Sequence, residues 1–237
     1  MQIKFSQLKI GFVLTMLFLF FTVAGTLLHE GGHWLASRLL GVPAEINYKS
    51  SSSNWDAFTS YREFMKLHKK NYEAIRSKKD FDDKETYEKL RSEVSNAINF
   101  TVWGGPIQTL LTGCLGVFIL LILKIKRAPF SWKYWASIFL ALFWLRPAMN
   151  LVMSLPKLIL RGEFAEQSDE VRLARYHEMH PMFISLVFGL IGLVVLTYIS
   201  FYVVPRNRLL VFWASGLMGG ILGFYLWFYQ LGPILMP

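Results

Sequence analysis

Charged residues and cysteines are both scarce in this chain of 237 residues. Charged side chains make up 17% of the sequence and hydrophobic ones 54%. A typical soluble domain has roughly a quarter of its residues charged, so this composition excludes an ordinary soluble protein and predicts a membrane protein. The single cysteine, Cys114, excludes an internal disulfide and a zinc site built from several thiolates.

Acidic residues are also few: the chain has 16 of them and 25 basic residues, which gives a formal net charge of +9. The excess basic residues lie in short loops between apolar runs rather than on a folded polar face. We therefore expect the lipid bilayer, with its anionic headgroups, as a partner and we expect no nucleic-acid partner. Basic residues near the ends of the apolar runs are almost equally numerous on the two sides, which leaves the membrane orientation open.

Five apolar runs are long enough to cross a membrane. The first continues past its apolar core to about Leu40, where Gly41-Val42-Pro43 ends the helix. A cleaved signal peptide is the alternative for this run, but its apolar core would be too long. The runs are Ile10–Leu28, Ile107–Ile125, Trp132–Leu155, Met182–Val204 and Leu209–Leu231. We predict an all-α polytopic membrane protein with five transmembrane helices, in the cell membrane if bacterial, with its termini on opposite sides.

A polar segment separates the first two spans. Its apolar and aromatic residues recur at helical spacing in two stretches, around Phe64 and around Leu90. We expect a helical hairpin outside the membrane, with its turn at Lys78–Asp83. The chain then divides into residues 1–49 with the first span, the insert 50–99, residues 100–181 with spans two and three, and residues 182–237 with the last two spans.

The segment His29-Glu30-Gly31-Gly32-His33 matches the pattern H-E-x-x-H. Residues four apart lie on one face of a helix, so both imidazoles can bind the same metal ion. Neutral imidazole suits Zn²⁺, and bound zinc lowers the pKa of its water to about 7. Glu30 lies close enough to act as the general base that accepts a proton from this water. We expect one Zn²⁺ per chain with Glu30 as the catalytic residue; the alternative is a purely structural histidine pair.

A zinc site of this kind needs a third protein ligand. No Asp, Glu or His occurs from Gly104 to Arg161, which leaves other histidines and the carboxylates after the third span. The candidates are His68, His177, His180, Glu163, Glu166, Asp169 and Glu170. The loop after span three lies on the same side of the membrane as the motif, and Ser168 can cap the helix that follows. Asp169 is the predicted ligand and Glu170 the alternative.

These residues and their surroundings resemble the site-2 protease family of intramembrane zinc metalloproteases. The stretch from His29 to Pro43 resembles the first core helix of that family, and Gly104-Gly105-Pro106 is similar to the element that opens its next helix. The stretch from Asn150 to Pro156 resembles its Asn-and-Pro segment. The usual Leu-Asp-Gly is absent, and Ser168-Asp169-Glu170 occupies the corresponding place.

The resemblance implies hydrolysis of a peptide bond in or near a transmembrane segment of a membrane-protein substrate. It also implies that Asn150 hydrogen-bonds the substrate. One alternative is a membrane-embedded zinc hydrolase of a lipid-linked or small substrate, because metal-activated water does not itself select an amide. Another is a non-catalytic scaffold of the same fold, against which the intact Glu30 argues.

An arginine lies inside the third span. Arg146 needs a partner there, because a charge within a membrane span is unfavourable without one. A kink at the neighbouring Pro147 could open room for a substrate, although ordinary helix packing explains that proline equally well.

Overall fold

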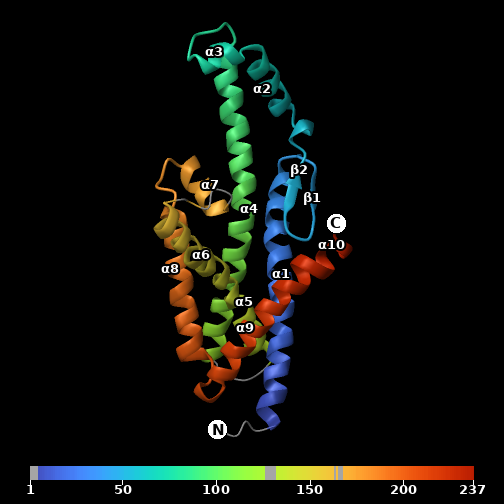
Figure 1. The fold of residues 1–237 in the computed structure, drawn as a ribbon, viewed down its shortest axis with the longest axis vertical. Helices are drawn as coiled ribbons and strands as arrows, with labels where there is room; N and C mark the ends of the chain where they lie inside the picture. The colour runs from blue at the N-terminus through green and yellow to red at the C-terminus, as the bar shows by residue number, and fades with distance from the viewer. Residues whose placement is uncertain (1–4, 126–131, 163, 165–167) are drawn as a thin grey trace.

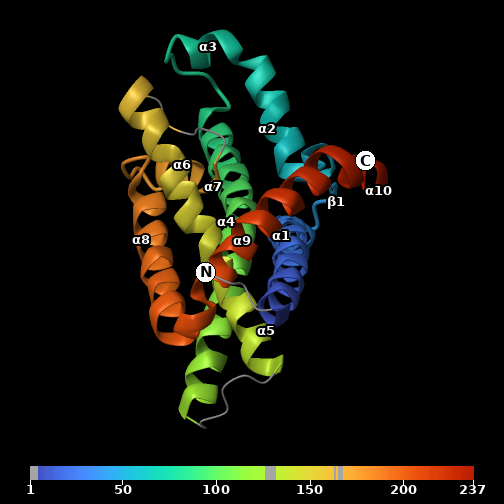
Figure 2. The same ribbon diagram turned by 60° about the horizontal axis from the view of Figure 1, so that its bottom comes forward.

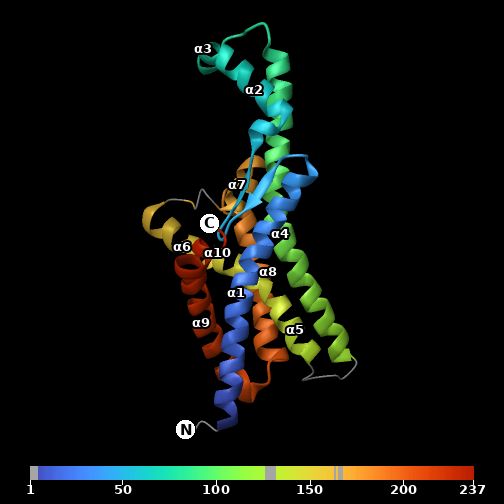
Figure 3. The same ribbon diagram turned by 90° about the vertical axis from the view of Figure 1, so that its right-hand side faces the viewer.

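The computed structural model describes residues 5–125, 132–162, 164 and 168–237, which form an elongated bundle of helices (Figures 1, 2 and 3). Within these residues, five helices are long and apolar enough to cross a membrane. They are Gln7–Leu39, Lys84–Leu123, Trp132–Arg161, Phe183–Val203 and Arg206–Leu235. The prediction of an all-α, multi-pass membrane protein is therefore confirmed.

The first span is a single helix, α1 (Phe5–Leu39), which carries the H-E-x-x-H motif near its end. Gly41 ends it in the left-handed conformation, with φ of 73°, which a glycine adopts without steric strain. The following amide, Val42 N, donates to the Ser37 carbonyl oxygen at 3.0 Å. The helix thus ends close to where the sequence predicts, at Leu39, fewer than two turns beyond the motif.

The last span, α9 (Leu209–Tyr225), packs closely along the first half of α1. A Cβ at Gly219 would lie 2.4 Å from the Thr15 carbonyl oxygen, so only a glycine permits this approach. Ser215 Oγ also donates to the Gly11 carbonyl oxygen at 3.0 Å. The main apolar core surrounds this contact and stabilises the end of the bundle that lies opposite the motif. Its buried members include Leu14, Phe18, Leu120, Ile138, Phe139 and Phe212.

The second span belongs to the longest helix, α4 (Lys84–Ile125), which runs unbroken from the insert into the bundle. The glycine–proline element at Gly104, expected to open this helix, lies in its interior instead. The insert packs α2 (Thr59–Lys70) against the start of α4, with α3 (Tyr72–Arg76) at the tip, far from the bundle (Figure 1). His68 Nδ1 lies 3.1 Å from the Tyr87 hydroxyl across this hairpin.

A short antiparallel hairpin, which the sequence does not predict, joins α1 to the insert. Its strands β1 (Ala44–Ile46) and β2 (Ser51–Ser53) pair Ala44 with Ser53 and Ile46 with Ser51. The 3₁₀ turn η1 (Trp55–Ala57) then leads into α2. The hairpin lies beside the end of α1 (Figure 3). It therefore borders the H-E-x-x-H motif.

The third span is bent. Its first part, α5 (Trp132–Ala141), passes through the 3₁₀ turn η2 (Leu142–Trp144) into α6 (Leu145–Arg161), which leaves the direction of α5 (Figure 2). Pro147 follows directly, in the first turn of α6, where a missing amide hydrogen is tolerated. The bend carries the second half of this span across the bundle next to α8.

The remaining elements complete the bundle. They are α7 (Asp169–Tyr176), α8 (Phe183–Tyr198), the π-helical η3 (Ile199–Val203), the turn η4 (Arg206–Arg208), the π-helical η5 (Leu226–Leu231) and α10 (Gly232–Leu235). The chain ends beside the β1–β2 loop, where Tyr48 N donates to the Met236 carbonyl oxygen at 3.1 Å. Since α1 begins at the other end of the bundle (Figure 1), the arrangement agrees with an odd number of spans.

Candidate metal centre

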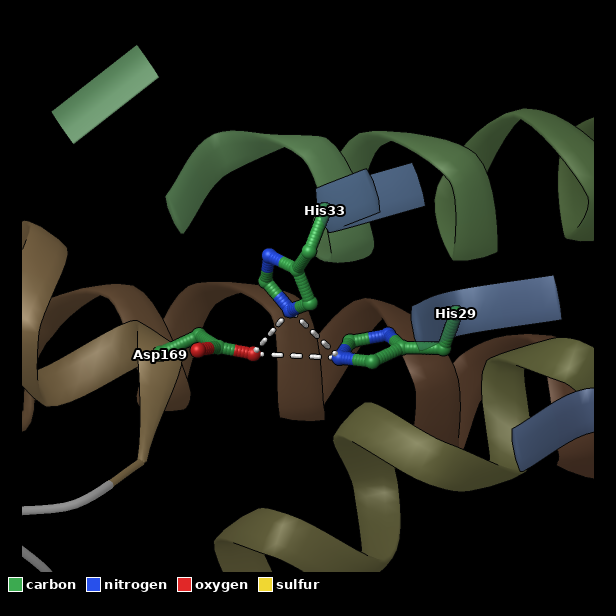
Figure 4. Close-up of side chains that lie close together, drawn as sticks. All are labelled: His29, His33 and Asp169. Carbon is green, nitrogen blue, oxygen red and sulfur yellow. Dashed lines mark hydrogen bonds and ion pairs between the residues drawn. The ribbon is translucent and has the colours of Figure 1, made fainter. Parts of the chain in front are cut away.

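Three ligand atoms from two distant parts of the chain converge near the end of α1 (Figure 4). His29 Nε2 and His33 Nε2 lie 3.3 Å apart. Asp169 Oδ2, from the first residue of α7, lies 3.0 Å from the former and 3.2 Å from the latter. These three residues form a candidate metal-binding group, and they are the three that the sequence singles out as ligands.

The far side of each imidazole is held by α4. His33 Nδ1 lies 2.8 Å from the Thr101 carbonyl oxygen, and His29 Nδ1 lies 2.9 Å from Thr109 Oγ1. A carbonyl oxygen only accepts, so the proton of neutral His33 resides on Nδ1 and its Nε2 presents a lone pair. Such contacts fix the orientation and tautomer of metal-binding histidines. The sequence does not predict that either threonine contacts a histidine, because these contacts depend on how α4 packs on α1.

The donor set fits a small divalent cation. When both imidazoles are neutral with the proton on Nδ1, two Nε2 lone pairs and a carboxylate oxygen point at one another, and this arrangement is favourable only with a cation between them. Tetrahedral zinc with bonds of about 2.0–2.1 Å places its ligand atoms roughly 3.3 Å apart. The observed separations of 3.0, 3.2 and 3.3 Å are close to that value. The group therefore fits zinc in both chemistry and spacing.

An imidazole has two tautomers, so without a cation either Nε2 can instead carry the proton and donate to Asp169. Burial raises the pKa of the Asp169 carboxyl, but its hydrogen bonds to His29 and His33 outweigh burial and hold that pKa below its usual range. Asp169 is therefore ionised at neutral pH, which is the state that a metal ligand requires.

Glycines make room for the group. A Cβ at Gly105 would lie 2.3 Å from His33 Nε2 and 2.7 Å from His29 Nε2. A Cβ at Gly32 would lie 2.3 Å from the Gly104 carbonyl oxygen. The two helices can thus touch at the motif, and the rings occupy the space that a side chain at Gly105 would fill.

Asp169, and not Glu170, faces the histidines. Ser168 Oγ accepts from Val171 N at 3.3 Å and caps α7, as the sequence predicts, so Asp169 begins the helix in a fixed position. The buried Glu170 instead accepts from Asn150 Nδ2 at 2.8 Å. The structure thus separates two carboxylates that the sequence leaves as alternatives, giving one to the histidines and the other to Asn150.

The other candidate ligands do not join the group. His68 lies in the insert, His177 packs against the Trp103 ring and His180 packs against Phe164. Glu163 and Glu166, also named from the sequence, lie outside the described residues.

Glu30 faces a cavity of about 440 Å³ that also contacts His33 and Asp169. Its Oε2 accepts from Ser51 N of β2 at 2.9 Å, which holds the carboxylate in place. Asn150 lines the same cavity, and so do the hydroxyl-bearing residues Ser50, Ser51, Ser53, Thr101 and Ser168. Three residues of one serine run, Ser50, Ser51 and Ser53, therefore form one wall of the cavity.

Arg146 is the partner of Glu30 across the cavity, with Nη2 at 3.9 Å from Oε1. Its position in the first turn of α6, just after the bend at η2, points it towards α1. The partner that an arginine in a span requires is therefore the carboxylate of the motif itself.

Comparisons of the chain with models of known protein families, with curated proteins and with solved structures find no match. The structure shows a multi-pass membrane protein with a buried His-His-Asp group that could hold a metal ion.

Proposed function

We propose that this protein is an intramembrane zinc metalloprotease of the site-2 protease kind, which hydrolyses a peptide bond in or near a transmembrane segment of a membrane-protein substrate. The observation that carries the proposal is that Glu30 lies in the same cavity as two members of the metal-binding group, His33 and Asp169. A carboxylate beside a metal site is the arrangement that hydrolysis by a general base requires.

The residues have separate roles in this proposal. His29, His33 and Asp169 hold one zinc ion, and Thr101 and Thr109 keep the two imidazoles turned towards it. When bound, zinc lowers the pKa of a water molecule to about 7 and polarises the scissile carbonyl. Glu30 accepts the proton of the attacking water and passes it to the nitrogen that leaves.

Asn150 is suited to hold the substrate backbone. Its Nδ2 is engaged by Glu170 Oε1 at 2.8 Å, which fixes the orientation of the amide. Within the described part of the chain no donor is bound to its Oδ1, so this atom can accept from a backbone N–H of a substrate in the cavity. The role of Glu170 is then to orient Asn150, not to bind metal.

The position of the site along α1 favours a substrate bond at or near the membrane. The metal-binding group follows directly after the apolar run that ends at Leu28, and the cavity beside it reaches the exposed Arg172 of α7. A peptide that leaves the bilayer can therefore enter from the polar side while the rest of its span stays in lipid.

Substrate trapping with Glu30→Gln tests the proposal. The isosteric amide removes the general base but leaves the metal ligands, so turnover should fall by about 10²–10⁴-fold while zinc is retained. Glu45→Gln, an exposed carboxylate of β1, is the matched control and should keep wild-type turnover.

The partner retained by Glu30→Gln, identified by mass spectrometry, should be a membrane protein that the wild type cleaves and the variant does not. A lipid-linked molecule in its place would support the lipid hydrolase instead. Near-normal turnover in Glu30→Gln would remove the assignment of Glu30 as the base.

A further inference from the structure

The guanidinium of Arg146 lies in the cavity with unused hydrogen-bonding capacity. It has five N–H donors, yet its ion-pair partner among the described residues is Glu30, with Oε1 at 3.9 Å from Nη2. That separation is too long for a hydrogen bond. The arginine is thus held near the motif while its donors remain free for another acceptor.

Arg146 also borders the metal-binding group on two sides. It lines the large cavity with His33 and Asp169, and it lines a smaller hollow with His29 and Thr109. A cation in a membrane span is unfavourable, and a residue that only balanced Glu30 would be expected to hydrogen-bond it. The position therefore suggests an acceptor that arrives with the substrate.

The proposed reaction creates such an acceptor. When water attacks the scissile carbonyl carbon, the C=O π electron pair moves onto the oxygen, which becomes negatively charged. Donors that are already oriented towards this oxygen lower the barrier, because they interact more strongly with the transition state than with the substrate. Asn150 is less suited to this task, since its amide nitrogen already donates to Glu170 Oε1.

We propose that Arg146 is a catalytic residue whose guanidinium hydrogen-bonds the carbonyl oxygen of the scissile bond as negative charge develops there; this inference rests on the proposed function. The C–O bond to water forms while Glu30 accepts the proton of the water. The electron pair then returns from the oxygen to carbon, the C–N bond breaks and the nitrogen takes the proton from Glu30. Arg146 keeps its own protons throughout.

Arg146→Gln is the direct test. Loss of a donor to a developing oxyanion lowers kcat by about 10²–10³-fold, and KM should change little because the substrate carbonyl carries no full charge. Zinc content should be unchanged. Arg161→Gln, at the exposed end of the same helix and outside the cavity, is the charge-matched control and should keep wild-type kcat.

Two further measurements separate catalysis from a structural role. A phosphinic peptide carries a tetrahedral, anionic group in place of the scissile bond, so Arg146→Gln should weaken its inhibition by the same factor as it lowers kcat. The double variant Glu30→Gln/Arg146→Gln should still capture substrate as well as Glu30→Gln does. Arg146→Lys keeps the positive charge beside Glu30 and replaces Arg146→Gln in these tests if that variant does not fold. Its kcat should also be lower than that of the wild type, because lysine lacks the planar fork of donors.

The outcomes distinguish the two proposals. An active wild type and an inactive Glu30→Gln, together with wild-type kcat in Arg146→Gln or Arg146→Lys, would overturn the role of Arg146 alone. A raised KM with unchanged kcat, or loss of zinc in both arginine variants, would also overturn it. A wild type without zinc-dependent hydrolysis would overturn the proposed function and this inference together.

Discussion

Gly32 of α1 and Gly104 of α4 meet backbone against backbone beside the metal-binding group: a Cβ on either would lie 2.3 Å from the carbonyl oxygen of the other. This contact sets the distance between the helix that carries the histidines and the helix that orients them. A glycine within a helix lowers its stability by about 1 kcal/mol relative to alanine, so the close approach has to compensate for both residues.

Gly32→Ala should destabilise the protein, and its neighbour Gly31→Ala should not. A Cβ at Gly32 would force the helices apart, which typically lowers the free energy of unfolding by about 1–3 kcal/mol. No atom lies within 4 Å of a Cβ at Gly31, so alanine there should be neutral or stabilising by up to about 1 kcal/mol. Thermal unfolding of the two variants in detergent measures the difference, and equal midpoints would contradict the packing described.

Gly105→Ala should weaken zinc binding in a protein that still folds. The added Cβ would lie 2.3 Å from His33 Nε2, so the ring has to move out of its position. We expect a loss of at least about tenfold in zinc affinity, in the range caused by disturbing the residues around metal ligands. Gly220→Ala, where no atom lies within 4 Å, is the control. Competition with a chelator measures both affinities; identical values would show that Gly105 does not make room for the rings.

Ser51→Pro should lower turnover, whereas Ser51→Ala should retain it. The amide of Ser51 donates to Glu30 Oε2 at 2.9 Å, and proline has no such hydrogen. A hydrogen bond to a charged group contributes about 1.5–3 kcal/mol, so kcat should decrease by about tenfold or more. The hydroxyl of Ser51 has no partner within the described part of the chain, so its removal should matter little. Equal kcat values for the two variants would mean that β2 does not hold Glu30.

Much of the arrangement could be predicted because it depends on local patterns. The spacing of His29 and His33 follows from the helix repeat, and the five apolar runs follow from composition. The place of Asp169 follows from counting spans and from the capping serine before it. Each of these inferences needs only the position of a residue within its own element.

The parts that could not be predicted depend on contacts between elements. A run of serines has little β propensity, so the sequence of Ser51–Ser53 does not predict a strand. The strand forms because these residues pair with Ala44–Ile46. The contacts of Thr101 and Thr109 with the histidines depend on the register of α4 along α1. Gly104-Gly105-Pro106 resembles a segment at which a helix begins, but these residues lie in the interior of α4. The close contact with Gly32 explains why position 104 is a glycine.

The third ligand is one of two carboxylates that are neighbours in the sequence, Asp169 and Glu170. Asp169 Oδ2 lies 3.0 Å from His29 Nε2, whereas Glu170 is hydrogen-bonded to Asn150. Loss of one of three protein ligands should weaken zinc binding by more than the 10–100-fold typical of a residue that only supports a ligand. Asp169→Ala should therefore lose zinc as His33→Ala does. Glu170→Gln and His177→Ala should bind zinc as tightly as the wild type.

The zinc content of these purified variants is the most direct test of the metal centre on which the proposed function depends. Elemental analysis should find one zinc per chain in the wild type, in Glu170→Gln and in His177→Ala. The same measurement should find almost none in His33→Ala and Asp169→Ala. Full zinc in Asp169→Ala, with loss in Glu170→Gln or His177→Ala instead, would contradict the assignment.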